Sequence, residues 1–380
     1  MANVSSSNGI EKYPKLRFPE FSDGYYESTL GEIFEYERPD NYIVISEKYS
    51  DAYPIPVLTA NQAFVLGYTS ETSGIYDKGP VILFDDFTCD MKYADFPFKV
   101  KSSAMKLLTS KKEIPIFYAY NLLQHINYKP EGHARHWISI MQPLKVLLPC
   151  YAEQERIGEF LSLVCKKIEK HQLLIDALKK YKRGLLQAVF SREVQFENSS
   201  GWERRLFSEL ASLSKGKYSP KQNEVLPCIE LEHLEQQTGQ IIGCTNSNEQ
   251  NSVKSVFHKG DVLFGKLRPY LRKFALPEYN GVCSSEIWVF HPKPDIDSTF
   301  LFYLIQSESF IAAANISSGT KMPRAEWSKV SNETFFVPGL SEQKRIANLF
   351  TTIDKRIVNA SASVNKLQCL KQGLLQQLFI

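Results

Sequence analysis

Long apolar runs and paired cysteines are absent from the sequence, which has 380 residues. No run reaches the roughly 18 apolar residues of a transmembrane helix, and the first residues, MANVSSSNGI, have neither the basic nor the apolar region of a secretory signal. The seven cysteines contain no C-x-x-C pair, which argues against a disulfide framework and against a zinc site. We therefore expect a cytoplasmic, globular protein with no metal site and no membrane association.

Catalytic signatures are also lacking. The chain has no Pro-Pro, which the Asn/Asp-Pro-Pro-aromatic motif of DNA methyltransferases requires, and it has no H-E-x-x-H or G-x-S-x-G. A nuclease-like combination of Pro294-Asp295 with Glu342-Gln343-Lys344 is present. Its second part opens a repeated segment whose other copy carries Glu155 in place of Lys344, so the match lacks the required context. We expect no catalytic residue in this chain.

The stretch GDVLFGKLRPYLRK, residues 260–273, resembles a phosphate-binding loop because Gly260, Gly265 and Lys266 fit G-x-x-x-x-G-K. Leu267 stands where the motif needs a hydroxyl for magnesium, and VLF between the glycines favours a buried strand over a glycine-rich loop. The sequence therefore predicts a strand and a basic turn here, and the cations are expected to serve another polyanion.

The net charge is only +3, but cations cluster locally. The first cluster is Lys99, Lys101, Lys106, Lys111 and Lys112, with no acid among them. The second, in residues 253–273, is Lys254, Lys259, Lys266, Arg268, Arg272 and Lys273, against Asp261 alone. Each cluster is compatible with a solvated surface or with a polyanion partner, and the organisation of the chain bears on that choice.

An internal repeat organises the chain. Residues 149–190 align without a gap with residues 338–379, at an offset of 189 residues and with 14 of 42 positions identical. Apolar residues recur every 3.5 positions in both copies, which predicts two long helices, each burying a narrow stripe against the other. Ser341 is expected to cap the second helix. The tail and the start of the first domain are echoed too, since Leu16-Arg17-Phe18 corresponds to Val194-Gln195-Phe196 and Gly24-Tyr25 to Gly201-Trp202.

Each apolar stripe is interrupted at the same place. Lys182 and Lys371 occupy equivalent stripe positions, and Gly184 and Gly373 follow them. A glycine inside a helix costs about 1 kcal/mol relative to alanine, so we expect a close helix approach or a bend at these points.

The segments between the helices are predicted to be mixed α and β. Short apolar stretches at 53–60, 80–84, 261–264 and 286–290 indicate strands, and FLFYLIQSESFIAAA at 300–314 indicates one helix. Near the end of each segment a glycine precedes basic residues and a tryptophan, in 132–137 and 319–327. These matching loops are candidate contact surfaces, although each tryptophan by itself favours a core position.

The chain resembles the specificity subunits of type I restriction-modification systems over nearly its whole length. The resemblance rests on PKLRFPEF (14–21), the Pro-x-x-x-Glu-Gln-x-x-Ile openings of both helices, GDVLFGKLRPYLRK with GVCSSEIWVF (281–290), and SSGTKMPRAEW (317–327). PVLTANQAFVLGY (56–68), PVILFDDFT (80–88) and FPFKVKSSAMK (96–106) are similar to another subtype of recognition domain in that family.

The resemblance implies an α+β fold in which two mixed α/β target-recognition domains are joined by two long antiparallel α-helices packed as a coiled coil, with a pseudo-two-fold internal repeat. The implied order is a tail (1–20), a first recognition domain (21–148), a spacer helix (149–192), a second recognition domain (193–337) and a second spacer helix (338–380). Each domain would read one half of a bipartite, asymmetric target in double-stranded DNA. The helices would set the spacing of the half-sites and dock two copies of the modification (methyltransferase) subunit.

The resemblance also implies that this subunit is not an enzyme and binds no cofactor. The assembled complex would be a site-specific adenine methyltransferase and ATP-dependent endonuclease, so S-adenosylmethionine, ATP and magnesium would belong to the modification and restriction subunits. A different class stays open at this point, namely a coiled-coil scaffold whose two domains bind protein or RNA.

Cations and hydroxyls in the clusters and loops are the expected DNA contacts, because such groups hold phosphates and read base edges. They are Lys99, Lys101, Ser102, Ser103, Lys106, Arg135 and His136 in the first domain, and Lys266, Arg268, Tyr270, Arg272, Thr320, Lys321 and Arg324 in the second. Residues expected in helix pairing and partner docking are Glu153, Gln154, Ile157, Leu161, Ile168, Leu185, Glu342, Gln343, Ile346, Phe350, Ile357 and Leu374.

Overall fold

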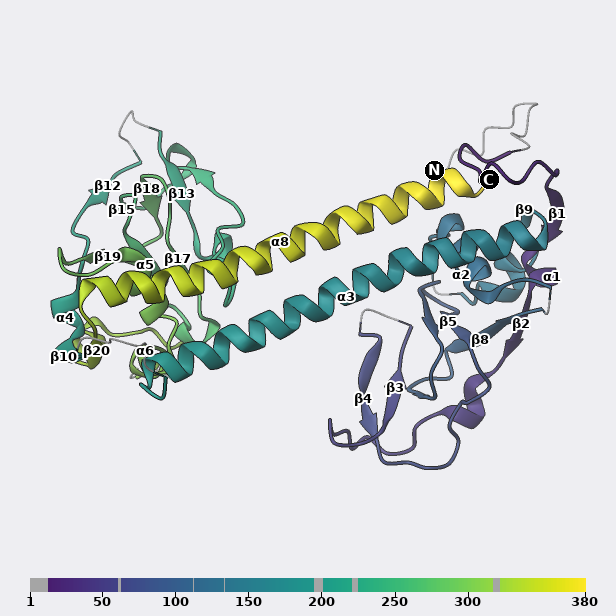
Figure 1. Ribbon diagram of the computed structural model, residues 1–380, viewed down its shortest axis with the longest axis horizontal. Coiled ribbons are helices and arrows are strands. Elements are labelled where there is room, and N and C mark those ends of the chain that lie inside the picture. The colour runs from purple at the N-terminus through teal and green to yellow at the C-terminus, as the bar shows by residue number, and fades with distance from the viewer. Residues whose placement is uncertain are drawn as a thin grey trace. The chain divides into compact units, whose positions relative to one another are not determined.

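A computed structural model describes residues 13–60, 63–111, 113–132, 134–194, 201–220, 225–316 and 322–380. The chain forms two compact units, of which unit 1 consists of Met1–Gln172 with Ala362–Ile380 and unit 2 of Leu173–Ser361. Two long helices, α3 (Tyr151–Phe190) and α8 (Leu340–Leu378), contribute a segment to each unit (Figure 1). Within the described ranges, no helix is long and apolar enough to cross a membrane.

Unit 1 contains a four-stranded antiparallel sheet, a three-stranded sheet and a strand pair. Its remaining elements are β1 (Tyr26–Thr29), α1 (Leu30–Ile33), β2 (Phe34–Glu37), β3 (Ile55–Leu58), β4 (Val65–Thr69), β5 (Val81–Asp85), β6 (Met91–Ala94), β7 (Lys99–Val100), β8 (Met105–Ser110), α2 (Ile116–Ile126) and β9 (Lys145–Leu148). The sheet orders are β2-β8-β5-β6, β4-β3-β7 and β1-β9. The β1-β9 pair brings the start and the end of the domain together at the opening of α3.

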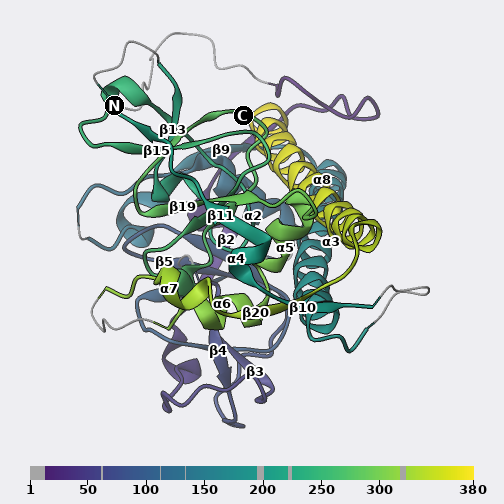
Figure 2. The same ribbon diagram turned by 90° about the vertical axis from the view of Figure 1, so that its left-hand side faces the viewer.

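Unit 2 repeats this plan with a larger second sheet. Its elements are β10 (Glu203–Leu206), α4 (Phe207–Leu210), β11 (Ala211–Leu213), β12 (Lys217–Tyr218), β13 (Pro227–Ile229), β14 (Thr245–Asn246), β15 (Lys254–Phe257), β16 (Val262–Gly265), β17 (Phe274–Ala275), β18 (Gly281–Cys283), β19 (Ile287–Pro292), α5 (Ser298–Leu304), α6 (Glu308–Ala314), α7 (Trp327–Val330) and β20 (Thr334–Val337). The orders β11-β19-β16-β17 and β10-β20 match the four-stranded sheet and the strand pair of unit 1. In unit 2, α5 lies between these strands and the long helices (Figure 2).

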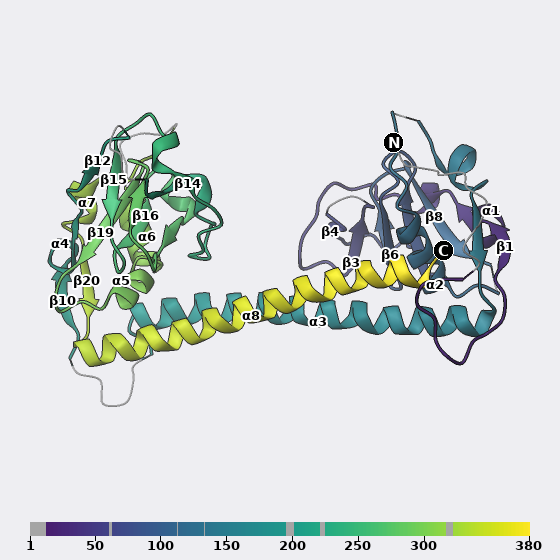
Figure 3. The same cartoon turned by 90° about the horizontal axis from the view of Figure 1, so that it is seen from above.

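The two long helices run antiparallel. In unit 1, Ile157 and Leu161 near the start of α3 share one core with Leu374 and Leu378 near the end of α8. In unit 2, Lys182 near the end of α3 contacts Asp354 in the first half of α8. Figure 3 shows both helices from above. The two predicted long helices and the mixed α and β character of the segments between them are confirmed, and so is the predicted strand in GDVLFGKLRPYLRK, which is β16.

The two helix openings use the same hydrogen bonds. The carbonyl of Cys150 accepts from the backbone nitrogens of Glu153 (3.1 Å) and Gln154 (3.0 Å). The carbonyl of Gly339 accepts from those of Glu342 and Gln343 at 2.9 and 3.0 Å. The expectation that Ser341 caps α8 is wrong, because the helix begins at Leu340 and its first turn closes on Gly339.

Two further expectations are corrected. Residues 300–314 form two helices, because the Ser307 hydroxyl accepts from the backbone nitrogen of Phe310 and starts α6 as a new helix. A Cβ added at Gly184 or Gly373 would have no neighbouring atom within 4 Å, so neither glycine marks a close approach among the described residues, and the alternative of a bend stays a prediction.

Candidate nucleic-acid interface

Asp86 joins two of the predicted DNA contacts of unit 1 inside the domain. Its carboxylate accepts from the backbone nitrogens of His136 (3.1 Å) and Trp137 (2.8 Å) and lies 3.2 Å from the Lys106 ammonium. Lys106, His136 and Trp137 are all buried. The loop that ends in Trp137 is therefore tied to the loop after β5 by an interior carboxylate, and Lys106 and His136 do not face solvent.

Lys99 is also an interior side chain. Its ammonium lies 2.9 Å from Glu71 Oε2 and donates to the carbonyl of Ser73 at 2.6 Å. Glu71 Oε1 in turn accepts from the backbone nitrogens of Ile45 and Ser46. This largely buried pair fixes two loops beside β7. The Lys99 ammonium is therefore used inside unit 1.

The other predicted contacts of unit 1 are available at the surface. Ser102 and Ser103 are exposed, and the exposed Arg135 lies over the Phe87 ring at 5.8 Å. The Lys101 ammonium is 2.9 Å from the carboxylate of the strongly exposed Glu47. An exposed pair of this kind is weak, so it does not prevent Lys101 from meeting a phosphate.

In unit 2, the backbone brings the two predicted contact segments together. The nitrogen of Arg268 donates to the carbonyl of Pro323 at 2.8 Å, and that of Ala325 donates to the carbonyl of Lys266 at 2.8 Å. Arg324 lies opposite Leu267 in an isolated antiparallel bridge. The basic turn after β16 and the loop before α7 therefore form one surface, although they are more than 50 residues apart in the sequence. Thr320 and Lys321 lie outside the described residues.

The basic turn has an unusual backbone. Arg268 and Arg272 both have φ of 52°, a left-handed conformation that is uncommon outside glycine. Arg268 and Tyr270 are exposed. Arg272 contacts the carboxylate of Glu308, and Arg324 lies 3.0 Å from Glu286. Backbone strain of this kind is often found at binding sites. Here it occurs in the short turn that carries Arg268, Tyr270 and Arg272.

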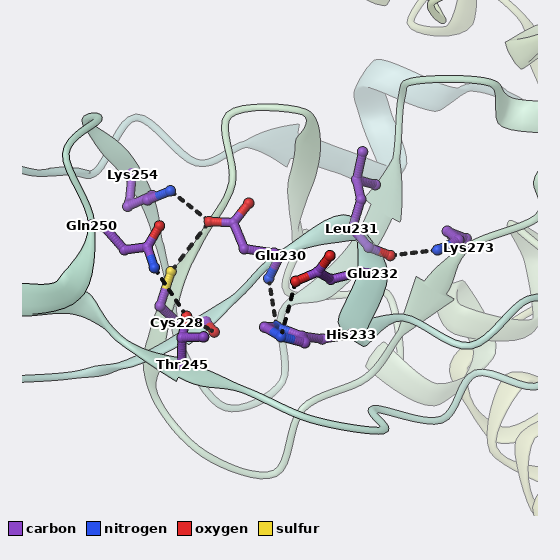
Figure 4. Close-up of polar contacts among 9 residues, drawn as sticks. All are labelled: Cys228, Glu230, Leu231, Glu232, His233, Thr245, Gln250, Lys254 and Lys273. Atoms are coloured by element: carbon purple, nitrogen blue, oxygen red, sulfur yellow. Dashed lines mark hydrogen bonds and ion pairs between the residues drawn. The ribbon is translucent and has the colours of Figure 1, made fainter.

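Two cations of the second cluster are used inside unit 2. Lys254 lies 2.5 Å from Glu230 and Lys273 donates to the carbonyl of Leu231 at 2.6 Å, as Figure 4 shows. The same group includes Cys228, whose thiol donates to Glu230 at 3.6 Å and whose burial raises its pKa to about 11. These contacts hold the end of β13 and remove Lys254 from the candidate surface.

Exposed amide side chains of unit 2 were not among the predicted DNA contacts, which were chosen as cations and hydroxyls. Between β13 and β15, the exposed amide side chains include Gln236, Gln237, Gln240, Asn246 and Asn248. Asn and Gln pair with adenine in the major groove, so this segment carries groups suited to base reading. The signal was present in the sequence as a concentration of amides in residues 236–251.

The predicted docking residues at the helix openings are buried. Glu153 is 0% exposed and accepts from Arg17 Nε and Nη2 (2.9 and 2.7 Å) and from the Tyr25 hydroxyl (3.2 Å). Its repeat partner Glu342 accepts from Trp202 Nε1 at 3.0 Å. The repeated Glu therefore joins each helix to the strand or tail that starts its domain.

The glutamines beside these acids share one equivalent hydrogen bond. The side-chain nitrogen of Gln154 donates to the carbonyl of Pro149 at 2.8 Å, and that of Gln343 donates to the carbonyl of Pro338 at 2.9 Å. The predicted seam residues Ile157, Leu161, Ile346, Phe350, Ile357 and Leu374 are buried, and Ile168 and Leu185 are partly buried. All of these side chains serve the interior.

Exposed apolar side chains on the long helices were not singled out from the sequence. They are Tyr151, Phe160, Leu163, Leu173, Leu174 and Tyr181 on α3 and Leu340, Val358 and Leu370 on α8. Tyr181 and Leu370 occupy equivalent repeat positions. Apolar groups left outside the seam are suited to binding another protein.

Comparison with known proteins agrees with the duplicated plan. The family described as "Type I restriction modification DNA specificity domain" matches residues 22–180 and 199–367. The chain is 29% identical over 350 residues to the type I restriction enzyme EcoR124I/EcoR124II specificity subunit of Escherichia coli, covering 86% of this chain and 85% of the relative. It is 26% identical over 278 residues to the EcoDI specificity subunit of the same organism, covering 62% of each.

Solved structures show the same fold. The S subunit of a type I restriction-modification system from M. genitalium superposes with a TM-score of 0.64 at 14% identity, covering 97% of this chain and 99% of that one. A chain from a study of complex assembly in the type I R-M system gives a TM-score of 0.52 at 14% identity, covering 93% and 97%. With two family domains over most of its length, the chain belongs to the family of type I restriction-modification DNA specificity subunits.

Proposed function

We propose that the two recognition domains read the two halves of one bipartite, asymmetric DNA target, while α3 and α8 set the half-site spacing and dock the modification subunits. The observation that carries this proposal is the repeat itself: identical helix openings support two domains whose surfaces differ. The position after β5 in unit 1 holds Asp86, a buried carboxylate that ties two loops together, whereas the matching position after β16 in unit 2 holds Lys266, which is partly exposed. Two different readers on one pair of helices suit two different half-sites at a fixed separation.

The proposed DNA contacts are the surface members of the predicted set. They are Lys101, Ser102, Ser103 and Arg135 in unit 1, and Lys266, Arg268, Tyr270, Arg272 and Arg324 in unit 2, with Thr320 and Lys321 kept from the sequence. Their cations suit phosphates, which fix register, and the exposed amides of residues 236–248 suit base edges. Lys99, Lys106 and His136 are left out because their partners are interior groups.

The chain is proposed to work as a non-catalytic part of a larger complex. Two copies of a modification subunit would bind the helices, with the exposed apolar side chains of α3 and α8 as contacts, and restriction subunits would join through that assembly. Adenine methylation and ATP-dependent cleavage, with S-adenosylmethionine, ATP and magnesium, would then reside in the partners.

The experiment has two stages. Methylation mapping of genomic DNA with and without this gene gives both half-sites and their spacing. Binding of the complex with its modification subunits is then measured against that duplex and a scrambled one over a range of salt concentrations. We expect strong preference for the mapped duplex and a steep loss of affinity with salt, since phosphate contacts release counterions. Equal affinity for all duplexes, or preference for RNA or protein, would reject the proposal.

The contact set is tested by Arg268→Asn, because Asn tolerates the left-handed backbone that this position requires. If Arg268 holds a phosphate, the salt slope falls by about 0.9 and all duplexes bind more weakly. If it reads a base, discrimination at one position of the second half-site falls by about 1–3 kcal/mol. Lys366→Met, on the exposed side of α8, is the matched loss of a cation and should change neither quantity.

A further inference from the structure

The lysine that interrupts the seam of α3 is an interior group. Lys182 is 7% exposed, and its ammonium lies 2.7 and 2.9 Å from the two carboxylate oxygens of Asp354 on α8. The ammonium also lies 5.2 Å from the centre of the Tyr303 ring. A cation at this position therefore bridges the two helices and touches the recognition domain of unit 2.

Tyr303 completes the contact from the domain side. It belongs to α5, and its hydroxyl donates to Asp354 Oδ2 at 2.8 Å while its ring packs on Phe350 of α8 with centroids 5.1 Å apart. One carboxylate thus receives a donor from α3 and a donor from α5. We call Lys182, Asp354 and Tyr303 the seam triad.

The seam triad favours one alignment of its three elements. Burial lowers the pKa of Lys182, and the charge and hydrogen bond of Asp354 oppose that shift, so the ammonium depends on this one partner. Burial also raises the pKa of Tyr303, which keeps its phenol protonated as a donor at neutral pH. A polar group at a coiled-coil core position costs stability but specifies the register, because every other alignment leaves a buried charge without its partner.

Packing of the domain on the helices is interrupted beside the triad. Lys182 and Asp354 line a pocket of about 510 Å³ between the helices and the recognition domain of unit 2, and a further polar contact of α8 is made by Gln343, which joins Asp295 and Asp297 before α5. Thr238, Gly239 and Gln306 line it from the domain, and Ile357 and Leu186 line it from the helices. Since the domain does not pack continuously on the helices here, discrete polar contacts carry more of its placement.

Unit 1 has a counterpart of different chemistry. Lys371, at the repeat position of Lys182, donates to Gln124 Oε1 at 2.8 Å, and Gln124 Nε2 donates to the Tyr120 hydroxyl at 2.8 Å. The repeat position of Asp354 is Cys165, so no carboxylate stands between helix and domain there. Both seam lysines therefore contact a tyrosine-bearing helix of a domain, but the charged form is specific to unit 2.

We propose that the seam triad is a positioning device that fixes the second recognition domain on the helix pair and thereby limits which spacer between half-sites the complex accepts. The inference rests on the proposed function, in which the helices set the spacing. One additional base pair moves a half-site by about 3.4 Å and turns it by about 35°. A domain held at Asp354 cannot follow that movement without losing a charged hydrogen bond.

Tyr303→Phe tests the device most directly, because it removes the hydroxyl that ties α5 to Asp354 and leaves the Lys182–Asp354 pair and the ring packing in place. The complex with modification subunits is assayed on the mapped duplex and on duplexes with the spacer one base pair longer or shorter. The readout is the ratio of dissociation constants between altered and mapped spacers, which does not depend on the folded fraction. We expect Tyr303→Phe to lower this ratio about tenfold, as loss of a hydrogen bond to a charged group implies.

The matched control is Tyr279→Phe, which removes a tyrosine hydroxyl of unit 2 that makes no hydrogen bond among the described residues. It should keep the wild-type ratio. Lys182→Met should lower the ratio at least as far as Tyr303→Phe, because it leaves the Asp354 carboxylate without its cationic partner. Discrimination between cognate and mismatched bases within the second half-site should stay at the wild-type level in both triad variants.

Two results would overturn the proposal. The first is a spacer ratio in Tyr303→Phe equal to that of wild type and Tyr279→Phe. The second is an unchanged spacer ratio together with altered base discrimination, which would make Tyr303 part of the reading surface. If the wild-type complex itself shows no spacer preference, the proposed function fails along with the inference, so the two failures are distinguishable.

Discussion

At the scale of single residues, the repeated glutamates show what the duplication preserves. Glu153 and Glu342 occupy equivalent positions at the start of α3 and α8. Glu153 accepts hydrogen bonds from Arg17 and Tyr25, whereas Glu342 accepts from Trp202. The acid and its helix are kept, and the donor changes with the domain. Tyr25 and Trp202 are themselves equivalent in the repeat, so both domains are attached through an aromatic donor.

Loss of Arg17 should strongly destabilise unit 1. Among the described residues, Arg17→Met leaves the buried carboxylate of Glu153 with only the Tyr25 hydroxyl as a side-chain donor. Removing one partner of a buried pair costs about 3–5 kcal/mol, because the remaining charge keeps its desolvation penalty. Denaturant unfolding, followed with a probe in unit 1, should show this loss of unfolding free energy.

Arg156→Met is the matched control for that change. Arg156 lies 3.7 Å from Glu20, and both side chains are at least half exposed. A solvated pair contributes at most about 1 kcal/mol, so unit 1 should keep nearly all of its stability. Equal losses in the two variants would show that the Arg17–Glu153 contact has no special weight.

At the scale of elements, the periodicity of apolar residues predicted those helices and strands that depend on local sequence pattern. The long helices and the strands β3, β5, β16 and β19 follow directly from apolar spacing, which burial on one face requires. The break between α5 and α6 was missed because FLFYLIQSESFIAAA is apolar enough for one helix. There a single hydroxyl, Ser307, decided the outcome by capping the second helix.

The candidate surfaces were harder to predict, because a cation's role depends on acids distant in sequence. Lys106 and Arg135 looked alike as members of basic stretches, but Lys106 meets Asp86 in the interior while Arg135 stays exposed. Lys99 similarly meets Glu71. Lys266, Arg268 and Arg324 were predicted as DNA contacts, but their association was not predicted, since it depends on backbone hydrogen bonds between two loops.

Helix α2 should make unit 1 sensitive to acid. Burial lowers the pKa of His125, which stacks on Phe379 of the chain's last residues. The unfolded chain therefore binds a proton at higher pH than the folded one, so this contribution is complete above about pH 6.5 and is lost as pH falls through the lowered folded pKa.

His125→Phe keeps an aromatic ring against Phe379 and removes the titration. The unfolding free energy of unit 1 should then decline less between pH 7 and pH 5 than in wild type, measured by denaturant midpoints at each pH. Parallel curves for the two proteins would mean that His125 does not contribute to the acid sensitivity.

At the scale of the whole molecule, both long helices pass from one unit to the other, at residues 172–173 in α3 and 361–362 in α8. Inserting seven residues at both points preserves the 3.5-residue phase of the seam and lengthens each helix by about 10.5 Å. The proposed spacing role predicts that the preferred spacer grows by about three base pairs while both half-sites stay the same. Methylation mapping in cells that express the lengthened chain gives the new motif directly.

The single insertions are the controls for that experiment. Seven residues added to α3 alone or to α8 alone put the two seams out of register. We therefore expect cells that express these chains to lose methylation, rather than to methylate a motif with a changed spacer. If the double insertion changes the bases of a half-site and leaves the spacer alone, the helices do not set the spacing.

Unit 1 combines Met1–Gln172 with Ala362–Ile380, which affects when its core can be completed during translation. Leu374, Leu378 and Phe379 belong to its core, and the backbone nitrogen of Leu16 donates to the carbonyl of Gln377 at 2.9 Å. Unit 2 ends at Ser361, so the ribosome has supplied all of its residues while unit 1 still waits for Ala362–Ile380. At about 5–20 residues per second, that interval lasts about one to four seconds. The domain translated first is therefore completed last, and during translation its apolar core stays open to chaperones after unit 2 has all the residues it needs.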